Sequence, residues 1–182
     1  AEPTIGIITN VGTSHIELLG SQEAIAEAKG ELIRCLGPDS VAILNEDDHF
    51  VKAMSSIAKG KTVTYGIHSN ATVIGSHLRY KKDGIKFTCK CYDEVFDVFL
   101  PMIGEHNVYD ALAAIAAGRV LGVKSSKIKK GLSEFTGTPM RQEIVAFDDI
   151  VILNDAYNAN PSSMSESIKA LGQLEGKRKI AM

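Results

Sequence analysis

Lys29 is the residue whose surroundings are least ordinary for its type. It falls four residues after Ile25 and four before Ile33, inside the apolar stripe of a helix expected from about Ser21. A lysine buried among apolar side chains loses stabilisation of its charge, so its pKa can fall and the neutral amine can react with carbon dioxide. The product is a carbamate, an anionic oxygen ligand for a metal ion. The alternative is that the amine reaches past the stripe to the surface and stays an ordinary ammonium.

His15 is the second candidate metal ligand. It lies in a polar loop that follows a short apolar strand at residues 5–8. Open α/β sheets bind ligands at the carboxyl ends of their strands, and imidazole is a common metal ligand. The alternative is a solvated loop histidine with no ligand.

Other polar residues could bind a nucleotide. His106 and Asn107 lie at the expected start of a helix, where capping alone also explains them. Arg141 lies between two expected domains, so it could bind a phosphate or a ribose in the cleft or be an ordinary surface charge. Asn158 and Asn160 also suit turns.

A phosphate-binding loop of the strand–loop–helix type is not among these 182 residues. Gly60, Lys61 and Thr62 have the order of its last residues, but the pattern needs a glycine where this sequence has Ser55. The segment also leads into an expected strand and not into a helix.

The cysteines favour a reduced environment. There are three, Cys35, Cys89 and Cys91, and the first residues have no basic and apolar stretch of a signal peptide. Cys89 and Cys91 are two apart in a strand-like run, so we expect them on one face as ordinary strand residues.

The order of apolar runs predicts an α/β fold with an antiparallel insertion. Buried-strand patterns at residues 5–8 and 41–44 alternate with helical patterns at about 21–36 and 46–58. Residues 63–100 read as extended runs with turns near 83 and 93. Helices are expected again at about 107–121 and 126–135, then a linker at 136–139. Two strands at 144–147 and 150–153 precede a helix from Pro161.

Size and charge set further limits. The chain has 182 residues with 45% apolar and 23% charged side chains and a formal net charge of -2. This is enough for one core and part of a second, and it favours neither a nucleic-acid partner nor a membrane span. We expect one domain over residues 1–140 and the first part of another over 141–182. The strand patterns at both ends suggest a fragment of a longer protein.

Taken together, these segments resemble the Mur ligase family. The similar stretches are residues 8–15 (ITNVGTSH), 28–31 (AKGE), 104–110 (GEHNVYD) and 155–161 (DAYNANP). No single stretch is decisive, but their order and spacing are specific. Within the family, the last stretch and the AKGE stretch are most similar to the branch that adds D-alanyl-D-alanine.

The resemblance implies roles for individual residues. Lys29 is expected to be a carbamylated lysine that holds a magnesium ion together with His15. The residues expected around ATP are His106, Asn107, Asp110, Arg141, Asp155, Tyr157 and Asn158. The family often has asparagine where this chain has Asp110, and an ionised aspartate accepts but cannot donate a hydrogen bond. The role of Asp110 as a base contact is therefore the least supported.

The resemblance also implies a fold and a reaction. The fold is the three-layer central domain of a Mur ligase with a small antiparallel insertion, followed by the start of a Rossmann-like C-terminal domain. The intact enzyme is a cytoplasmic monomer that uses ATP and Mg²⁺ to join D-alanyl-D-alanine to UDP-N-acetylmuramoyl-tripeptide through an acyl phosphate. These residues alone are expected to be inactive, because the family's phosphate loop lies upstream of them. Alternatives are a ligase of the folate polyglutamate or cyanophycin type, and a non-catalytic nucleotide-binding module that needs neither Lys29 nor His15.

Overall fold

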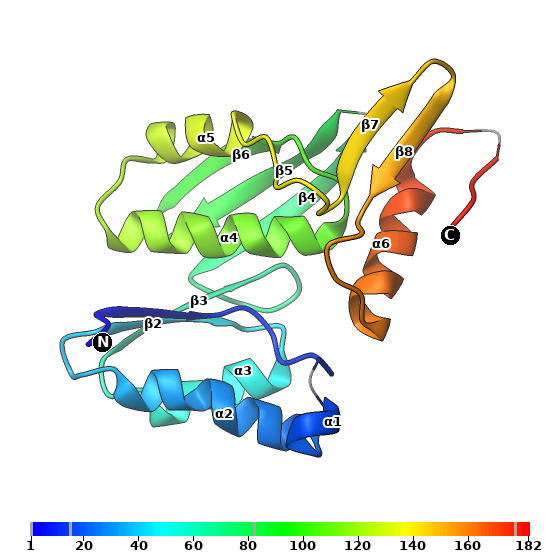
Figure 1. Cartoon of the computed structure of the whole chain (residues 1–182). Helices are drawn as coiled ribbons and strands as arrows, with labels where there is room; N and C mark the ends of the chain where they lie inside the picture. Colours follow the sequence, from blue (N-terminus) through cyan, green and yellow to red (C-terminus); the bar gives the residue numbers. More distant parts are fainter. Residues whose placement is uncertain (1, 15, 82, 177) are drawn as a thin grey trace.

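A mixed six-stranded sheet with helices on both faces makes up most of the molecule (Figure 1). The computed structural model describes residues 2–14, 16–81, 83–176 and 178–182. The strands lie side by side in chain order: β1 (Ile5–Ile8), β2 (Val41–Asn45), β3 (Lys61–Gly66), β4 (Val73–Lys81), β5 (Gly84–Cys91) and β6 (Glu94–Leu100). The predicted three-layer α/β architecture is confirmed. Within the described residues, every helix is too short or too polar to span a bilayer.

Helices α2 and α3 cover one face of the sheet, and α4 and α5 cover the other (Figure 1). The helices are α1 (Ile16–Leu19), α2 (Gln22–Cys35), α3 (His49–Ala53), a 3-10 turn (Met54–Ile57), α4 (Glu105–Val120) and α5 (Ser125–Ser133). Strand β2 shows why both faces are covered. Its Leu44 packs in the cluster of α2 with Ile33, whereas the preceding Ile43 packs with Leu112 of α4. Successive strand residues face opposite layers, so a continuous apolar run requires a cover on each side.

The parallel and antiparallel parts form one continuous sheet. Strands β1 to β4 pair in parallel, and β4, β5 and β6 pair antiparallel. The antiparallel part therefore begins at Val73 and not at the expected residue 63, because β3 pairs in parallel with β2. A short apolar run does not reveal the direction of its partner, which explains this difference.

Cys89 and Cys91 lie on the buried face of β5, as predicted. Both thiols are free and belong to the core, together with Ile85 and Phe87 of the same strand. Burial raises the pKa of Cys89 to about 12, so its thiol stays protonated at neutral pH.

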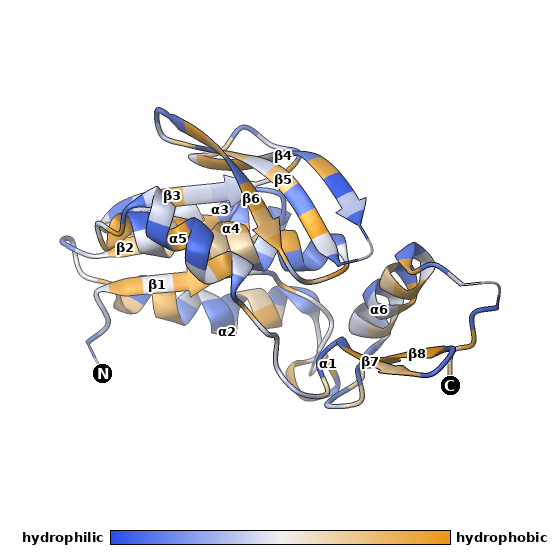
Figure 2. Ribbon diagram, turned by 90° about the horizontal axis from the view of Figure 1, so that it is seen from above, coloured by the Kyte–Doolittle hydropathy of each residue, from blue (hydrophilic) through white to orange (hydrophobic). Residues whose placement is uncertain are grey.

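A β-hairpin and one helix form the last part of the chain. They are β7 (Glu143–Phe147), β8 (Ile150–Asn154) and α6 (Pro161–Gln173). Figure 2 shows hydrophobic residues along both strands of the hairpin. The exposed ones are Ile144, Val145, Phe147, Ile150, Val151 and Ile152. The hairpin thus contributes little to the core, and the sheet carries the packing.

Asn160 caps α6, so we expect its replacement to weaken that helix. Its side chain accepts a hydrogen bond from Ser163 N at 2.9 Å, and Ser163 Oγ in turn accepts one from Asn160 N. Asn160→Ala should lower the free energy of unfolding of this part by about 1 kcal/mol. Asn158→Ala is the matched control, because among the described residues that side chain accepts a hydrogen bond from the neighbouring Ala159 N alone. Urea unfolding followed by circular dichroism measures both, and equal losses would contradict the assignment.

Candidate functional site

The carboxyl ends of β1, β2 and β3 meet at one edge of the sheet, which the N-terminal end of α4 also reaches. Two tandem carboxylates after β2 organise this edge. Asp48 caps α3 and also accepts a hydrogen bond from Val11 N at 2.8 Å, and Val11 lies in the loop after β1. Asn45 donates to Thr9 O at 2.9 Å in the same loop. Thr9 and Val11 of the loop after β1 are therefore fixed to the end of β2.

Asp47 fixes the other side of the edge. Its Oδ2 accepts hydrogen bonds from Ile67 N at 2.6 Å, His68 N at 3.0 Å and Tyr109 Oη at 2.9 Å. Burial opposes its ionisation, but the hydrogen bonds from His68, Ile67 and Tyr109 outweigh it and lower the pKa of Asp47 to about 2. Asp47 thereby joins the ends of β2 and β3 to the first turns of α4. The sequence indicated only a cap at this position.

Lys29 lines a pocket of about 450 Å³ beside the loop after β1. Its Nζ donates to Asn10 O at 2.7 Å, and Asn10 also lines the pocket. The lysine is half-buried, which agrees with the alternative that its amine reaches past the apolar stripe. The reason is that Ile25 and Ile33 face the sheet, whereas Ala28 beside Lys29 is exposed, so Lys29 lies at the shoulder of the stripe.

The metal prediction rests on Lys29 alone in the described part of the chain, because His15 lies outside the described residues. Among the residues described, no three His, Cys, Asp or Glu side chains come close enough to hold a metal ion. An ammonium at Lys29 would repel Mg²⁺. A carbamate at the same position would offer the oxygen donors that Mg²⁺ prefers, and the pocket has room for it. The site fits magnesium only with that modification.

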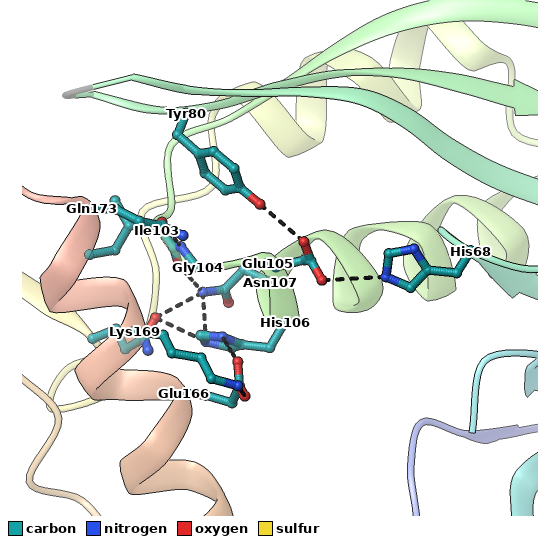
Figure 3. A network of polar contacts seen from close by, with 11 residues as sticks. His68, Tyr80, Ile103, Gly104, Glu105, His106, Asn107, Glu166, Lys169 and Gln173 are labelled. Atoms are coloured by element: carbon teal, nitrogen blue, oxygen red, sulfur yellow. Dashed lines mark hydrogen bonds and ion pairs between the residues drawn. The ribbon is translucent and has the colours of Figure 1, made fainter. Parts of the chain in front are cut away.

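The first turn of α4 is the centre of a polar network (Figure 3). Gly104, at φ 87°, caps the helix, so α4 begins before the expected position and leaves His106 and Asn107 in its first turn. Glu105 accepts a hydrogen bond from Tyr80 at 3.1 Å and lies 3.7 Å from His68. These contacts join α4 to β4 and to the end of β3.

Helix α6 lies against the same turn of α4. Gly104 N donates to Gln173 Oε1 at 3.1 Å, and His106 Nδ1 lies 3.9 Å from Glu166. Between them, Gly104, Glu166 and Gln173 border a pocket of about 340 Å³. It is further lined by Tyr80, Glu105, His106, Tyr109 and Lys169. Its volume lies in the range of small-molecule sites.

Gln142 joins several predicted nucleotide residues, although nothing in its sequence context indicated this role. Its Oε1 lies 3.0 Å from both His106 Nε2 and Asn107 Nδ2. Its backbone N donates to Asp155 Oδ1 at 3.2 Å. Gln142 is 8% exposed and has a left-handed backbone with φ 52°. Neither property is visible in a linker sequence.

Arg141 and Tyr157 form a separate pair. The guanidinium carbon lies 4.1 Å from the centre of the Tyr157 ring, and both side chains are exposed. The ring holds the guanidinium plane while its N–H groups stay available for an anion.

Asn158 and Asp110 lie apart from these groups. Asn158 bonds to the backbone beside it, as a turn residue does. Asp110 is exposed, one turn along α4 from His106. Of the seven predicted nucleotide residues, the structure thus connects His106, Asn107 and Asp155 through Gln142 and pairs Arg141 with Tyr157.

Comparisons with known proteins consistently find Mur ligases. The family profile described as the Mur ligase middle domain matches residues 1–118. A UDP-N-acetylmuramoyl-tripeptide–D-alanyl-D-alanine ligase of Bacillus subtilis (strain 168) is 40% identical over 177 residues, which is 97% of this chain and 38% of that protein. This chain therefore spans less than half the length of that relative.

Solved structures agree with the sequence comparison. A crystal structure of MurF from Acinetobacter baumannii superposes with a TM-score of 0.91 at 31% identity, over 96% of this chain and 38% of that one. MurF ligase from Thermotoga maritima in complex with ADP superposes with a TM-score of 0.87 at 24% identity, over 97% of this chain and 41% of that one. The second likeness shows the fold alone.

Proposed function

The chain belongs to the Mur ligase family, and from that premise we propose that it is the nucleotide- and metal-binding part of a ligase that joins D-alanyl-D-alanine to UDP-N-acetylmuramoyl-tripeptide. The observation that carries the proposal is the convergence at one edge of the sheet. The Lys29 pocket and the polar turn of α4 are both fixed to the end of β2, by Asp48 and Asp47 respectively. A bound nucleotide and a metal ion would therefore be held at a fixed distance and orientation relative to each other.

The reaction we propose activates a carboxylate. The terminal carboxylate of the tripeptide attacks the γ-phosphate of ATP, giving an acyl phosphate and ADP. The amine of D-alanyl-D-alanine then attacks the acyl carbon, the C–O bond to phosphate breaks, and the amine loses a proton as the amide forms. Activation is needed because a free carboxylate is a poor electrophile.

The metal-binding residues would be Lys29, as a carbamate, and His15. When bound, Mg²⁺ supplies positive charge that offsets the repulsion between the attacking carboxylate and the triphosphate. The contact from Lys29 Nζ to Asn10 O supports this role, because it places the amine at the carboxyl end of β1.

The nucleotide would lie between α4 and the last part of the chain. His106 and Asn107 would contact the adenine, with Asp110 nearby. Asp155 would bind the ribose through the carboxylate oxygen that Gln142 N does not use, and Arg141 would bind phosphate. Tyr157 holds the Arg141 guanidinium, and Asn158 would lie in the loop beside them. Contacts from both sides would exclude water that hydrolyses the acyl phosphate.

The deciding experiment is an assay of the protein that carries this chain. With ATP, Mg²⁺ and UDP-N-acetylmuramoyl-tripeptide, phosphate release should depend on D-alanyl-D-alanine, and mass spectrometry should find the pentapeptide product. Phosphate release that depends instead on glutamate with a folate, or on aspartate or arginine with cyanophycin, would assign the chain to another branch of the ligase family. ADP binding without any ligation would make it a binding module.

Two further expectations follow from the proposal. The 182-residue chain alone should show no ligation, because a Gly-rich phosphate loop is not among its residues. Since ATP and the uridine nucleotide precursor are cytoplasmic, we place the reaction in the cytoplasm, and light scattering should find a monomer.

A further inference from the structure

Gln142 touches both sides of the proposed nucleotide site. Its side chain contacts His106 and Asn107 on α4, whereas its backbone N–H donates to Asp155, which follows β8. Its neighbour Arg141 lies on the Tyr157 ring. Two adjacent residues thus contact most of the residues predicted to bind the nucleotide.

The hydrogen bonds define what the Gln142 amide does. Asn107 Nδ2 has two N–H groups, and its two carbonyl acceptors are Ile103 O at 2.6 Å and Gln142 Oε1 at 3.0 Å. The amide oxygen of Gln142 can only accept a hydrogen bond, and it lies 3.0 Å from His106 Nε2 as well. Asn107 Nδ2 also lies 3.1 Å from His106 Nε2, so the three side chains form one polar cluster. One oxygen of Gln142 therefore contacts both side chains of the α4 turn.

The backbone around Gln142 adopts conformations that are unfavourable for residues with side chains. Met140 and Gln142 both have left-handed conformations, with φ of 61° and 52°, which side-chain-bearing residues rarely adopt. The turn is closed by bonds from Arg141 N to Thr138 O and from Tyr157 N to Met140 O, both at 3.1 Å. Such a conformation persists only where surrounding contacts over-determine it.

We propose that Gln142 is a positioning residue that couples the base-binding residues of α4 to Asp155, so that both parts of the site contact a bound nucleotide at the same time. The proposal rests on the proposed function for the place of the nucleotide. Gln142 acts through His106, Asn107 and Asp155, and it need not touch the ligand itself.

The test compares three variants of the protein that carries this chain. Gln142→Met keeps the length of the side chain but removes the acceptor, whereas Gln142→Glu keeps an acceptor oxygen in place. Asn154→Ala is the matched control, because the Asn154 side chain also forms a hydrogen bond in the last part of the chain, to Glu143 Oε2 at 3.1 Å, without touching His106 or Asn107. Calorimetry gives the dissociation constants for ADP and for inosine diphosphate, which differ at the base.

Gln142→Met should weaken ADP binding about tenfold and lower the preference for ADP over inosine diphosphate, because the base contacts lose their support. The dissociation constant of Gln142→Glu for ADP should stay within about threefold of that of the unaltered protein, and so should that of Asn154→Ala. Equal weakening in Gln142→Met and Asn154→Ala, or an unchanged preference between the two nucleotides in Gln142→Met, would overturn the proposal. If the variants bind ADP with the expected changes in affinity but the protein shows no dipeptide-dependent phosphate release, the role of Gln142 is supported and the ligase function is rejected.

Discussion

Lys29→Ala should reduce kcat/KM for ligation by at least about a thousandfold in the protein that carries this chain. That factor corresponds to roughly 4 kcal/mol of transition-state stabilisation, which is the scale expected when a metal ion that neutralises developing charge is lost. The lysine is placed for this role by its contact with Asn10 O and by the pocket in front of it. Phosphate release and product formation measure the change.

Two variants separate a carbamate from a simple positive charge. Lys29→Arg keeps a cation that can donate to Asn10 O, but a guanidinium does not form the carbamate, so it should be as inactive as Lys29→Ala. Lys59→Ala is the matched control, because the Lys59 amine also donates to a backbone carbonyl, Arg34 O at 2.8 Å, far from the edge of the sheet. It should be fully active. An active Lys29→Arg variant would reject the carbamate.

The source of the carbamate gives an independent measurement. Since it forms from carbon dioxide, activity should fall after exchange into buffer free of carbon dioxide and return on addition of bicarbonate. With ¹³C-labelled bicarbonate, a carbamate carbon signal should be present in the unaltered protein and absent in Lys29→Arg. Activity that does not respond to carbon dioxide, with no such signal, would leave Lys29 as a structural donor.

The sheet could be predicted from sequence because it is built from local patterns. The run at β2 alternates between two apolar clusters, and β5 places Cys89 and Cys91 on its buried face, as period-two patterns require. The pairing direction of β3 was not available from its own residues. It depends on β2, which is distant in sequence and adjacent only after folding.

The candidate site was predicted in part, for a related reason. A helical stripe places Lys29 between Ile25 and Ile33, but it cannot distinguish the centre of the stripe from its edge. Gln142 and Asp47 were missed because their partners lie 35 to 36 and 20 to 62 residues away. The roles of such polar residues depend on contacts that exist only in the folded chain. A regular spacing in the sequence does not reveal them.

Asp47→Asn should lower the free energy of unfolding at pH 7 by about 2 kcal/mol. The carboxylate accepts three hydrogen bonds at one oxygen, and bonds to a charged acceptor are worth more than neutral ones. An asparagine keeps one acceptor oxygen without the charge. Urea unfolding measures the loss. Glu46→Gln is the control, because Glu46 forms a partly exposed ion pair with Lys52, and this replacement should cost less than about 1 kcal/mol.

The loss should also depend on pH in a defined direction. The pKa of Asp47 is lowered in the folded protein, from 3.8 to about 2, so its contribution is fully present above about pH 4 and disappears as the pH falls towards 2. The difference in stability between the unaltered protein and Asp47→Asn should therefore be constant from pH 7 to pH 5 and narrow between pH 4 and pH 3. A difference that widens on acidification would mean that the folded protein raises this pKa, and that the hydrogen bonds to Asp47 do not hold the edge of the sheet together.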